Sequence, residues 1–131
     1  MTKSIGAASG LAVCLAGATL AAQGATVRSL ASKDLAGVAG REVSLITVEY
    51  PPGGSSPVHT HHAQALVYVL EGSIEMQARG RPAVTLLPGQ TWYEGPDDVH
   101  VVSRNASNVA PAKYLVLMVK DKGAPILTSL K

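Results

Sequence analysis

Residues 53–72, GGSSPVHTHHAQALVYVLEG, join a break in the chain, a histidine cluster and a strand. The stretch opens with a Gly-Gly pair and a proline, which do not continue a β-ladder. Three histidines, His59, His61 and His62, follow directly. The apolar run 66–70 then ends at a Glu-Gly pair, as a strand ends at a turn. We therefore predict a loop, a group of candidate metal ligands and a strand in immediate succession.

Short β-like runs surround this stretch. Residues 42–50 are rich in β-branched side chains, and residues 74–78 alternate apolar with polar side chains, which predicts a hairpin with 66–70. Further runs, separated by turn signals, occupy residues 83–87, 90–94, 100–103 and 113–120. Short strands at this spacing are typical of a sandwich or barrel. The pattern predicts an all-β fold with at most one helical turn, near 33–38.

Length and composition limit the possible classes of protein. A chain of 131 residues has room for one compact domain. Hydrophobic residues make up 47% and aromatic residues only 4%, with no Phe, so Val, Leu, Ile and Ala must fill the core. The formal net charge is +2 and the basic residues are scattered, which argues against a nucleic-acid groove.

The first 24 residues have a pattern of their own. Lys3 precedes an uncharged, Ala- and Leu-rich run that ends in Ala-Gln-Gly. A basic start, an apolar middle and small residues at a cleavage site are typical of a signal peptide. We predict a signal peptide over 1–24 and a periplasmic or secreted domain over 25–131, without stable membrane insertion after cleavage. An uncleaved membrane anchor is the alternative. Cleavage would remove Cys14, the one cysteine, so the mature domain would offer neither a thiolate nor a disulfide.

The histidines are the strongest candidates for function. Residues two apart in an extended segment face the same side, so His59 and His61 point one way and His62 the other. Neutral imidazole is the commonest metal ligand, and a divalent metal site needs three or four converging donors. His100 is the remaining histidine and the candidate for the third donor. Periodicity alone leaves a metal site and a hydrogen-bonded polar cluster equally open.

The same residues resemble the sequence motifs of the cupin superfamily. Gly53, the pair His59 and His61, and the closing Gly72 follow the order of the first cupin motif. The second motif, from a glycine through a Pro-containing turn to a histidine, is matched by the stretch from 89 to 100. The resemblance implies a double-stranded β-helix (jelly-roll) barrel with a metal ion inside one end. Together with the barrel edges that so short a chain leaves uncovered, it makes a homodimer the expected assembly.

One departure from the family pattern concerns the fourth ligand. Ala65 stands where the first motif has its glutamate, and it ligates nothing. Gln64 is a candidate replacement through its amide oxygen. Glu94, six residues before His100, is the candidate catalytic residue as general base, or a further ligand, with an ordinary solvated glutamate as the alternative. Three histidines without a carboxylate favour Zn, Fe, Ni or Cu over Mg, Ca or Mn.

Two aromatic residues have alternative interpretations. Tyr68 lies within an apolar run and is predicted to pack in the core, with a substrate contact as the alternative. Trp92 is expected either on a pocket wall or beneath a loop.

Three functions remain open at this level. The cupin resemblance implies a metal-dependent enzyme of small organic molecules, such as a dioxygenase or an isomerase. A barrel that binds or senses a metal or a small ligand without turnover is the alternative from another class. A partner domain with a vestigial site is the third. Fold does not choose among them, so the choice depends on the geometry of the site.

Overall fold

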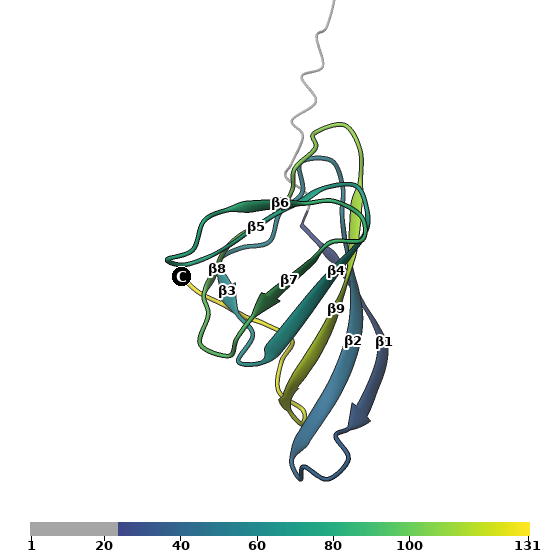
Figure 1. The fold of residues 1–131 in the computed structure, drawn as a ribbon, viewed down its shortest axis with the longest axis vertical. Coiled ribbons are helices and arrows are strands. Elements are labelled where there is room, and N and C mark those ends of the chain that lie inside the picture. The colour runs from purple at the N-terminus through teal and green to yellow at the C-terminus, as the bar shows by residue number, and fades with distance from the viewer. Residues whose placement is uncertain (1–23) are drawn as a thin grey trace, which may run out of the picture.

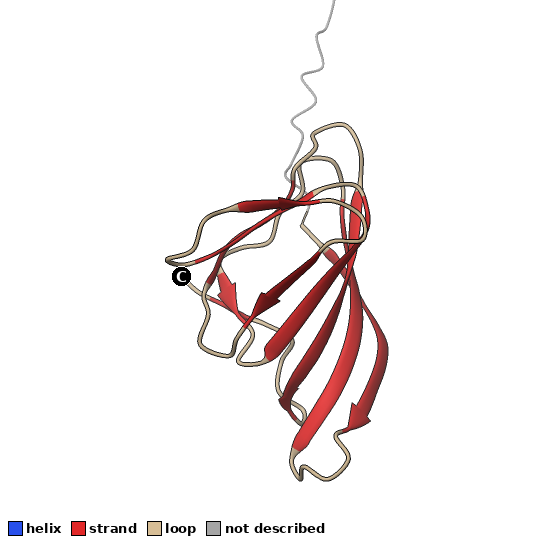
Figure 2. Ribbon diagram, in the orientation of Figure 1, coloured by secondary structure: helices blue, strands red, loops and turns tan. Residues whose placement is uncertain are grey.

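The computed structural model describes residues 24–131, so the predicted signal peptide lies outside the described residues apart from Gly24. The described part of the chain consists of strands and loops (Figure 2). Within it, no helix is long and apolar enough to span a membrane.

Ten strands form two antiparallel sheets (Figure 1). They are β1 (Thr26–Asp34), β2 (Arg41–Tyr50), β3 (His59–Thr60), β4 (Gln64–Glu71), β5 (Ile74–Ala78), β6 (Val84–Leu86), β7 (Thr91–Glu94), β8 (His100–Asn105), β9 (Ala112–Asp121) and β10 (Thr128–Ser129). The first sheet has the order β1-β2-β9-β4-β7 and the second β10-β3-β8-β5-β6. Because neighbours within each sheet are mostly distant in sequence, the chain crosses between sheets repeatedly. This arrangement confirms the predicted all-β jelly-roll barrel. The hairpin predicted between 66–70 and 74–78 is wrong, because β4 and β5 belong to different sheets.

The core lies between the two sheets and follows the period of two. On β5, Ile74 and Met76 are fully buried, as their alternation predicts. On β4, Val67 and Val69 point inward, whereas the apolar residues between and beside them point outward. Tyr68 is one of the outward residues and is 46% exposed, so the prediction that it packs in the core is wrong. A continuous apolar run hides which of its residues face the core.

Strand β1 and the loop that follows it differ from the sequence prediction. Every residue of β1 is exposed, and the strand pairs on one side only, with β2. An edge strand without a buried face carries no alternating pattern, which is why the sequence did not indicate it. The helical turn predicted near 33–38 is absent: β1 runs to Asp34, and a turn leads directly into β2.

The closing glycine of the histidine stretch has a steric role. Gly72 adopts a φ of +72° in the turn between β4 and β5. A Cβ atom at this position would lie 2.5 Å from the carbonyl oxygen of Pro111, just before β9. Only glycine allows this turn to pack so closely against the start of β9.

Candidate metal centre

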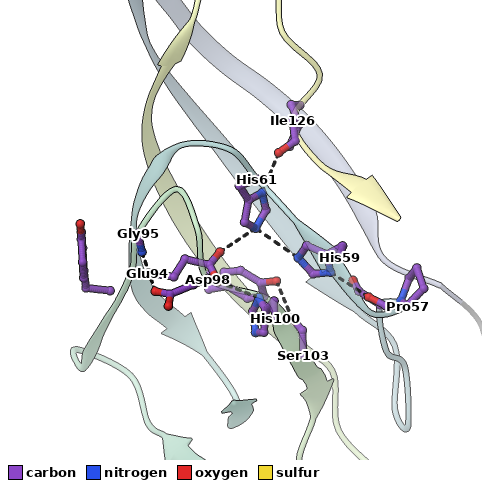
Figure 3. A network of polar contacts seen from close by, with 12 residues as sticks. Pro57, His59, His61, Glu94, Gly95, Asp98, His100, Ser103 and Ile126 are labelled. Carbon is purple, nitrogen blue, oxygen red and sulfur yellow. Dashed lines mark hydrogen bonds and ion pairs between the residues drawn. The ribbon is translucent and has the colours of Figure 1, made fainter. Parts of the chain in front are cut away.

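Four side chains from both sheets converge inside the barrel (Figure 3). His59 on β3 is paired directly with His100 on β8. His61 follows β3, and Glu94 is the last residue of β7. Opposed residues of antiparallel strands project to the same face. The register of the strands therefore brings His100 to His59, although they lie far apart in sequence.

The donor atoms of these four residues are close enough to share one ion. All four lie within 4.8 Å of one another. His61 Nε2 is 2.7 Å from Glu94 Oε1 and 3.1 Å from His59 Nε2. His100 Nδ1 is 3.3 Å from Glu94 Oε2. Two donors that bind one ion at ~2.1 Å and at right angles lie about 3 Å apart, so these separations suit a single coordinated ion.

Backbone carbonyls hold the outer nitrogens of two of the histidines. His59 Nδ1 is 2.7 Å from the carbonyl oxygen of Pro57, and His61 Nδ1 is 2.6 Å from that of Ile126 (Figure 3). A carbonyl oxygen only accepts, so each Nδ1 carries its hydrogen and each neutral ring has its lone pair on Nε2. Two lone pairs that face each other at 3.1 Å need a positive charge between them. A proton or a metal ion meets that need.

Within residues 24–131, and apart from the 3.3 Å contact between His100 Nδ1 and Glu94 Oε2, three buried polar atoms of the cluster have no hydrogen-bond partner. They are Glu94 Oε2 and both ring nitrogens of His100. Glu94 is 2% exposed and His100 3%, so both side chains are shielded from bulk solvent. An unsatisfied buried polar group costs about 1–3 kcal/mol, which a coordinated cation would remove. Of the two alternatives that the sequence left open, this observation favours the metal site over a closed hydrogen-bonded cluster.

The pKa is lowered for two of the three clustered histidines and raised for the third. Burial lowers the pKa of His100 to about 4, and it also lowers the pKa of His59. Burial acts on His61 in the same sense, but the hydrogen bond and the negative charge of Glu94 outweigh it and raise the pKa of His61. At neutral pH, His59 and His100 are therefore neutral and have free lone pairs. A proton in the metal-free cluster resides on His61, beside Glu94.

Glu94 lies directly opposite position 65, where the first cupin motif has its glutamate. Ala65 on β4 and Glu94 on β7 are a direct antiparallel pair, and both side chains are buried. The carboxylate therefore reaches the same region of the barrel from the neighbouring strand. The interpretation of Glu94 as an ordinary solvated glutamate is wrong, because its side chain is buried among the histidines.

The other two candidate polar residues of this segment lie apart from the cluster. Gln64 is exposed at the start of β4 and pairs with Val119 on the outer face of the sheet. The structure does not bring Gln64 to the three histidines. His62 is also exposed, as expected, and its Nε2 lies 3.2 Å from Thr60 Oγ1.

A stack of side chains covers His100 on its other side. The Trp92 ring centroid is 4.8 Å from that of His100. The Arg81 guanidinium lies 5.3 Å above the Trp92 ring and forms an ion pair of 2.8 Å with Asp98. Asp98 in turn accepts a hydrogen bond from the Gly95 amide, which fixes the turn after Glu94. Trp92 is not among the residues that line the cavity at the site; of its two alternatives it takes the place beneath a loop, packed between His100 and Arg81.

The cluster borders a small, mostly apolar cavity. Its volume is about 30 Å³. Aliphatic residues from both sheets, together with Ile126 and Leu127 near the C-terminus, form most of its wall. The hydrogen bonds that Ile126 and Pro57 accept from the histidines were not predicted. They are made by backbone carbonyl oxygens, which every residue type has.

Comparisons with known proteins agree with this fold. The family model for a cupin domain matches residues 46–118. Nectarin-1 from Nicotiana langsdorffii x Nicotiana sanderae is 36% identical over 69 residues, which are 52% of this chain and 30% of that protein. The DMSP lyase DddQ from Ruegeria pomeroyi DSS-3 is 25% identical, with a TM-score of 0.59 over 66% of this chain and 42% of the lyase. An oxalate oxidase in complex with the substrate analogue glycolate is 22% identical, with a TM-score of 0.65 over 87% of this chain and 59% of the oxidase.

These similarities cover only part of each relative. The match spans less than a third of nectarin-1 and under half of the lyase. The likeness to the oxalate oxidase concerns the fold.

We predict that the metal-free protein loses stability as the pH falls from 6.5 toward 4. The unfolded chain protonates His100 near its ordinary pKa of 6.5, whereas the folded chain does so only near 4, so unfolding takes up a proton in this window. The lowered pKa of His59 acts in the same direction, and the raised pKa of His61 opposes both. For His100 alone, the loss is on the order of 3 kcal/mol by pH 4. Urea unfolding of chelator-treated protein across this pH range measures it.

Two variants serve as controls for this titration. His62→Asn is expected to keep the wild-type pH slope, because His62 is exposed. His100→Asn is expected to flatten the slope. A His100→Asn variant with the wild-type slope would contradict the assignment to His100.

Proposed function

Because the chain belongs to the cupin domain family, we propose that it binds one divalent transition metal ion through His59, His61, His100 and Glu94. The observation that carries the proposal is the set of buried atoms without partners, Glu94 Oε2 and both His100 nitrogens. The four donor atoms all lie within 4.8 Å of one another, which supports the proposal. The carbonyl-held tautomers of His59 and His61 leave both Nε2 atoms free for the ion.

The donor set narrows the choice of metal. Three imidazoles and one carboxylate suit Zn, Fe, Ni or Cu, as proposed from the sequence. The argument against Mn rested on a missing carboxylate, and Glu94 removes it. Ca and Mg remain poor matches, because they prefer sites made entirely of oxygen donors.

The proposed chemistry is that of an ion with open coordination positions. Such an ion, when bound, supplies a Lewis acid or a redox centre for a small ligand. Glu94 has two roles in this proposal, since a carboxylate that binds through one oxygen keeps the other as a proton acceptor. Its Oε1 lies 2.7 Å from His61 Nε2 and its Oε2 3.3 Å from His100 Nδ1, so the two oxygens are directed at different histidines. The three histidines fix the position of the ion, and the aliphatic wall of the cavity limits access of water.

We propose a metal-dependent oxidoreductase or isomerase of small organic molecules. The similar oxalate oxidase was solved with glycolate, a small hydroxy acid, and the similar lyase acts on DMSP, also a small molecule. The alternative is a module that binds or senses a metal or a small ligand without turnover. Oxygen uptake and product analysis with a panel of small acids, phenols and diketones separate these two functions. A vestigial domain would bind no metal at all. Export to the periplasm or beyond stays a proposal from the sequence pattern of residues 1–24.

We predict that His59→Ala, His61→Ala and His100→Ala each weaken Zn²⁺ binding by more than about 100-fold. Loss of an outer partner of a ligand costs about 10–100-fold, and loss of the ligand itself costs more. Competition with a chromophoric chelator measures the affinity. The matched control is His62→Ala, which removes an exposed imidazole next to the site and is expected to bind Zn²⁺ like the wild type. Equal loss from all four variants would contradict the proposed ligand set.

We predict that the carboxylate can be moved between strands. Glu94→Ala is expected to lose Zn²⁺ affinity, and the double variant Ala65→Glu/Glu94→Ala to recover at least about tenfold of it, because positions 65 and 94 are directly opposed. The control is Gln64→Glu/Glu94→Ala, which places the same charge on the outer face and is expected to recover nothing. Recovery by the control, or none by the first double variant, would contradict the exchange of positions.

We also propose a homodimer, formed by the outer face of the sheet β1-β2-β9-β4-β7. Leu117 is paired with Leu66, and Leu66 with Tyr93, so one row of apolar side chains crosses three strands. These residues are between 40% and 51% exposed. A two-fold axis would bury this row against its own copy and remove the apolar area from water.

We predict that Leu66→Lys/Leu117→Lys converts the dimer to a monomer, because like charges would then meet across the two-fold axis. Sedimentation velocity measures the change. Leu87→Lys is the control, since Leu87 is 54% exposed but lies outside this row. A wild-type protein that sediments as a monomer at micromolar concentration would refute the proposed assembly.

A further inference from the structure

The last residues of the chain cross the mouth of the metal centre. We call residues 124–130 the C-terminal strap. Lys120 Nζ donates a hydrogen bond of 2.6 Å to the carbonyl oxygen of Ala124 at the start of the strap. Strand β10, within the strap, pairs with β3, where Ser129 is opposite His59. At its end, the Leu130 amide donates to the carbonyl oxygen of Val58 at 2.9 Å. The strap is thus fixed at both ends beside the histidines.

The middle of the strap contacts the site itself. The carbonyl oxygen of Ile126 accepts the hydrogen of His61 Nδ1 at 2.6 Å (Figure 3). Ile126 and Leu127 also form part of the cavity wall, and Ile126 packs against the core. The same two residues therefore orient one donor and bound the space in front of it.

The space that remains is very small. A water molecule needs about 10–15 Å³ of such volume, so a cavity of about 30 Å³ holds two water-sized groups. A metal ion among the donors would leave room for a ligand of only a few atoms. A larger ligand has to displace the strap or its side chains.

The charges at the site restrict the ligand further. Among the described residues 24–131, no Lys or Arg lines the cavity. Three neutral histidines, the carboxylate of Glu94 and a divalent ion sum to a single positive charge. A buried charge is costly unless it is paired, and one negative charge on the ligand balances this one. A second negative charge would have no cationic partner in the cavity.

We propose that the C-terminal strap determines which ligands the metal centre binds. These ligands are monoanions no larger than formate or azide. The strap does so through the side chains of Ile126 and Leu127, and its carbonyl at position 126 holds His61 in the tautomer that binds the ion. This proposal rests on the proposed metal site. It is narrower than the proposed function, because it excludes acids as large as glycolate while the strap is in place.

The test compares monocarboxylates of increasing length on the full chain loaded with Co²⁺, whose visible absorption reports a change of ligand. For the wild type, the apparent Kd is expected to rise at least about tenfold from formate to propionate. In Ile126→Ala/Leu127→Ala, which widens the cavity and keeps the backbone carbonyl, the two acids are expected to bind within about threefold of each other. Leu127→Ala alone is a milder variant should the double variant fail to fold. Leu87→Ala, outside both the strap and the cavity, is the control and is expected to keep the wild-type ratio.

The widened variant also tests the charge limit. Propionate is expected to bind to it at least about tenfold more tightly than malonate, which has a second carboxylate. Equal binding of formate and propionate to the wild type, an unchanged ratio in the widened variants, or tight binding of malonate would each overturn the proposal.

A measurement without metal separates this proposal from the metal site. In the metal-free protein at alkaline pH, long-range proton–nitrogen NMR is expected to find His61 protonated at Nδ1, where Ile126 holds the hydrogen. A His61 protonated at Nε2 would overturn the role of the strap even if Co²⁺ binds. If Co²⁺ does not bind to any variant, the proposed function and the ligand limit both fail, whereas the His61 tautomer still decides whether the strap holds this ring.

Discussion

The antiparallel register of two strand pairs determines whether this site exists. One pair places His59 opposite His100, and the other places Ala65 opposite Glu94. Because side chains alternate between the faces of a sheet, a slip of one residue in either pair would turn a donor to the opposite face. The surrounding structure supports the register: buried residues on β4 and β5 fix which face is inward, and the turn at Gly72 fixes where β4 ends.

The sequence predicted the part of the site that local geometry controls. His59 and His61 are two residues apart in an extended segment, so their convergence follows from the period of a strand. The role of Glu94 was not decided by the sequence, because it depends on the pairing of β7 with β4, which no local pattern defines. Gln64 has the right chemistry and is adjacent in sequence to the motif position, but alternation turns it outward. The hydrogen bond from His61 to Ile126 was not predictable either, because its acceptor is a backbone oxygen, which every residue has.

The fold was predicted to a similar extent and with a similar limit. Strands with one buried face, such as β5, are visible as alternation, and β2 and β9 are visible through their β-branched and apolar content. The run at 66–70 was correctly assigned to a strand, but Tyr68 was placed on the wrong face because both faces of β4 are apolar. The exposed edge strand β1 has no such pattern and was missed. In this chain, burial on one side is what makes a strand predictable.

The stacking of Trp92 on His100 has a practical consequence. Trp92 is the only tryptophan of the chain, and its ring lies 4.8 Å from the ring of a proposed ligand. Open-shell ions such as Cu²⁺ and Ni²⁺ quench indole emission over distances of this size, whereas closed-shell Zn²⁺ does not. The intrinsic fluorescence of this protein thus offers an internal optical probe, without a label, that distinguishes one class of ion from the other.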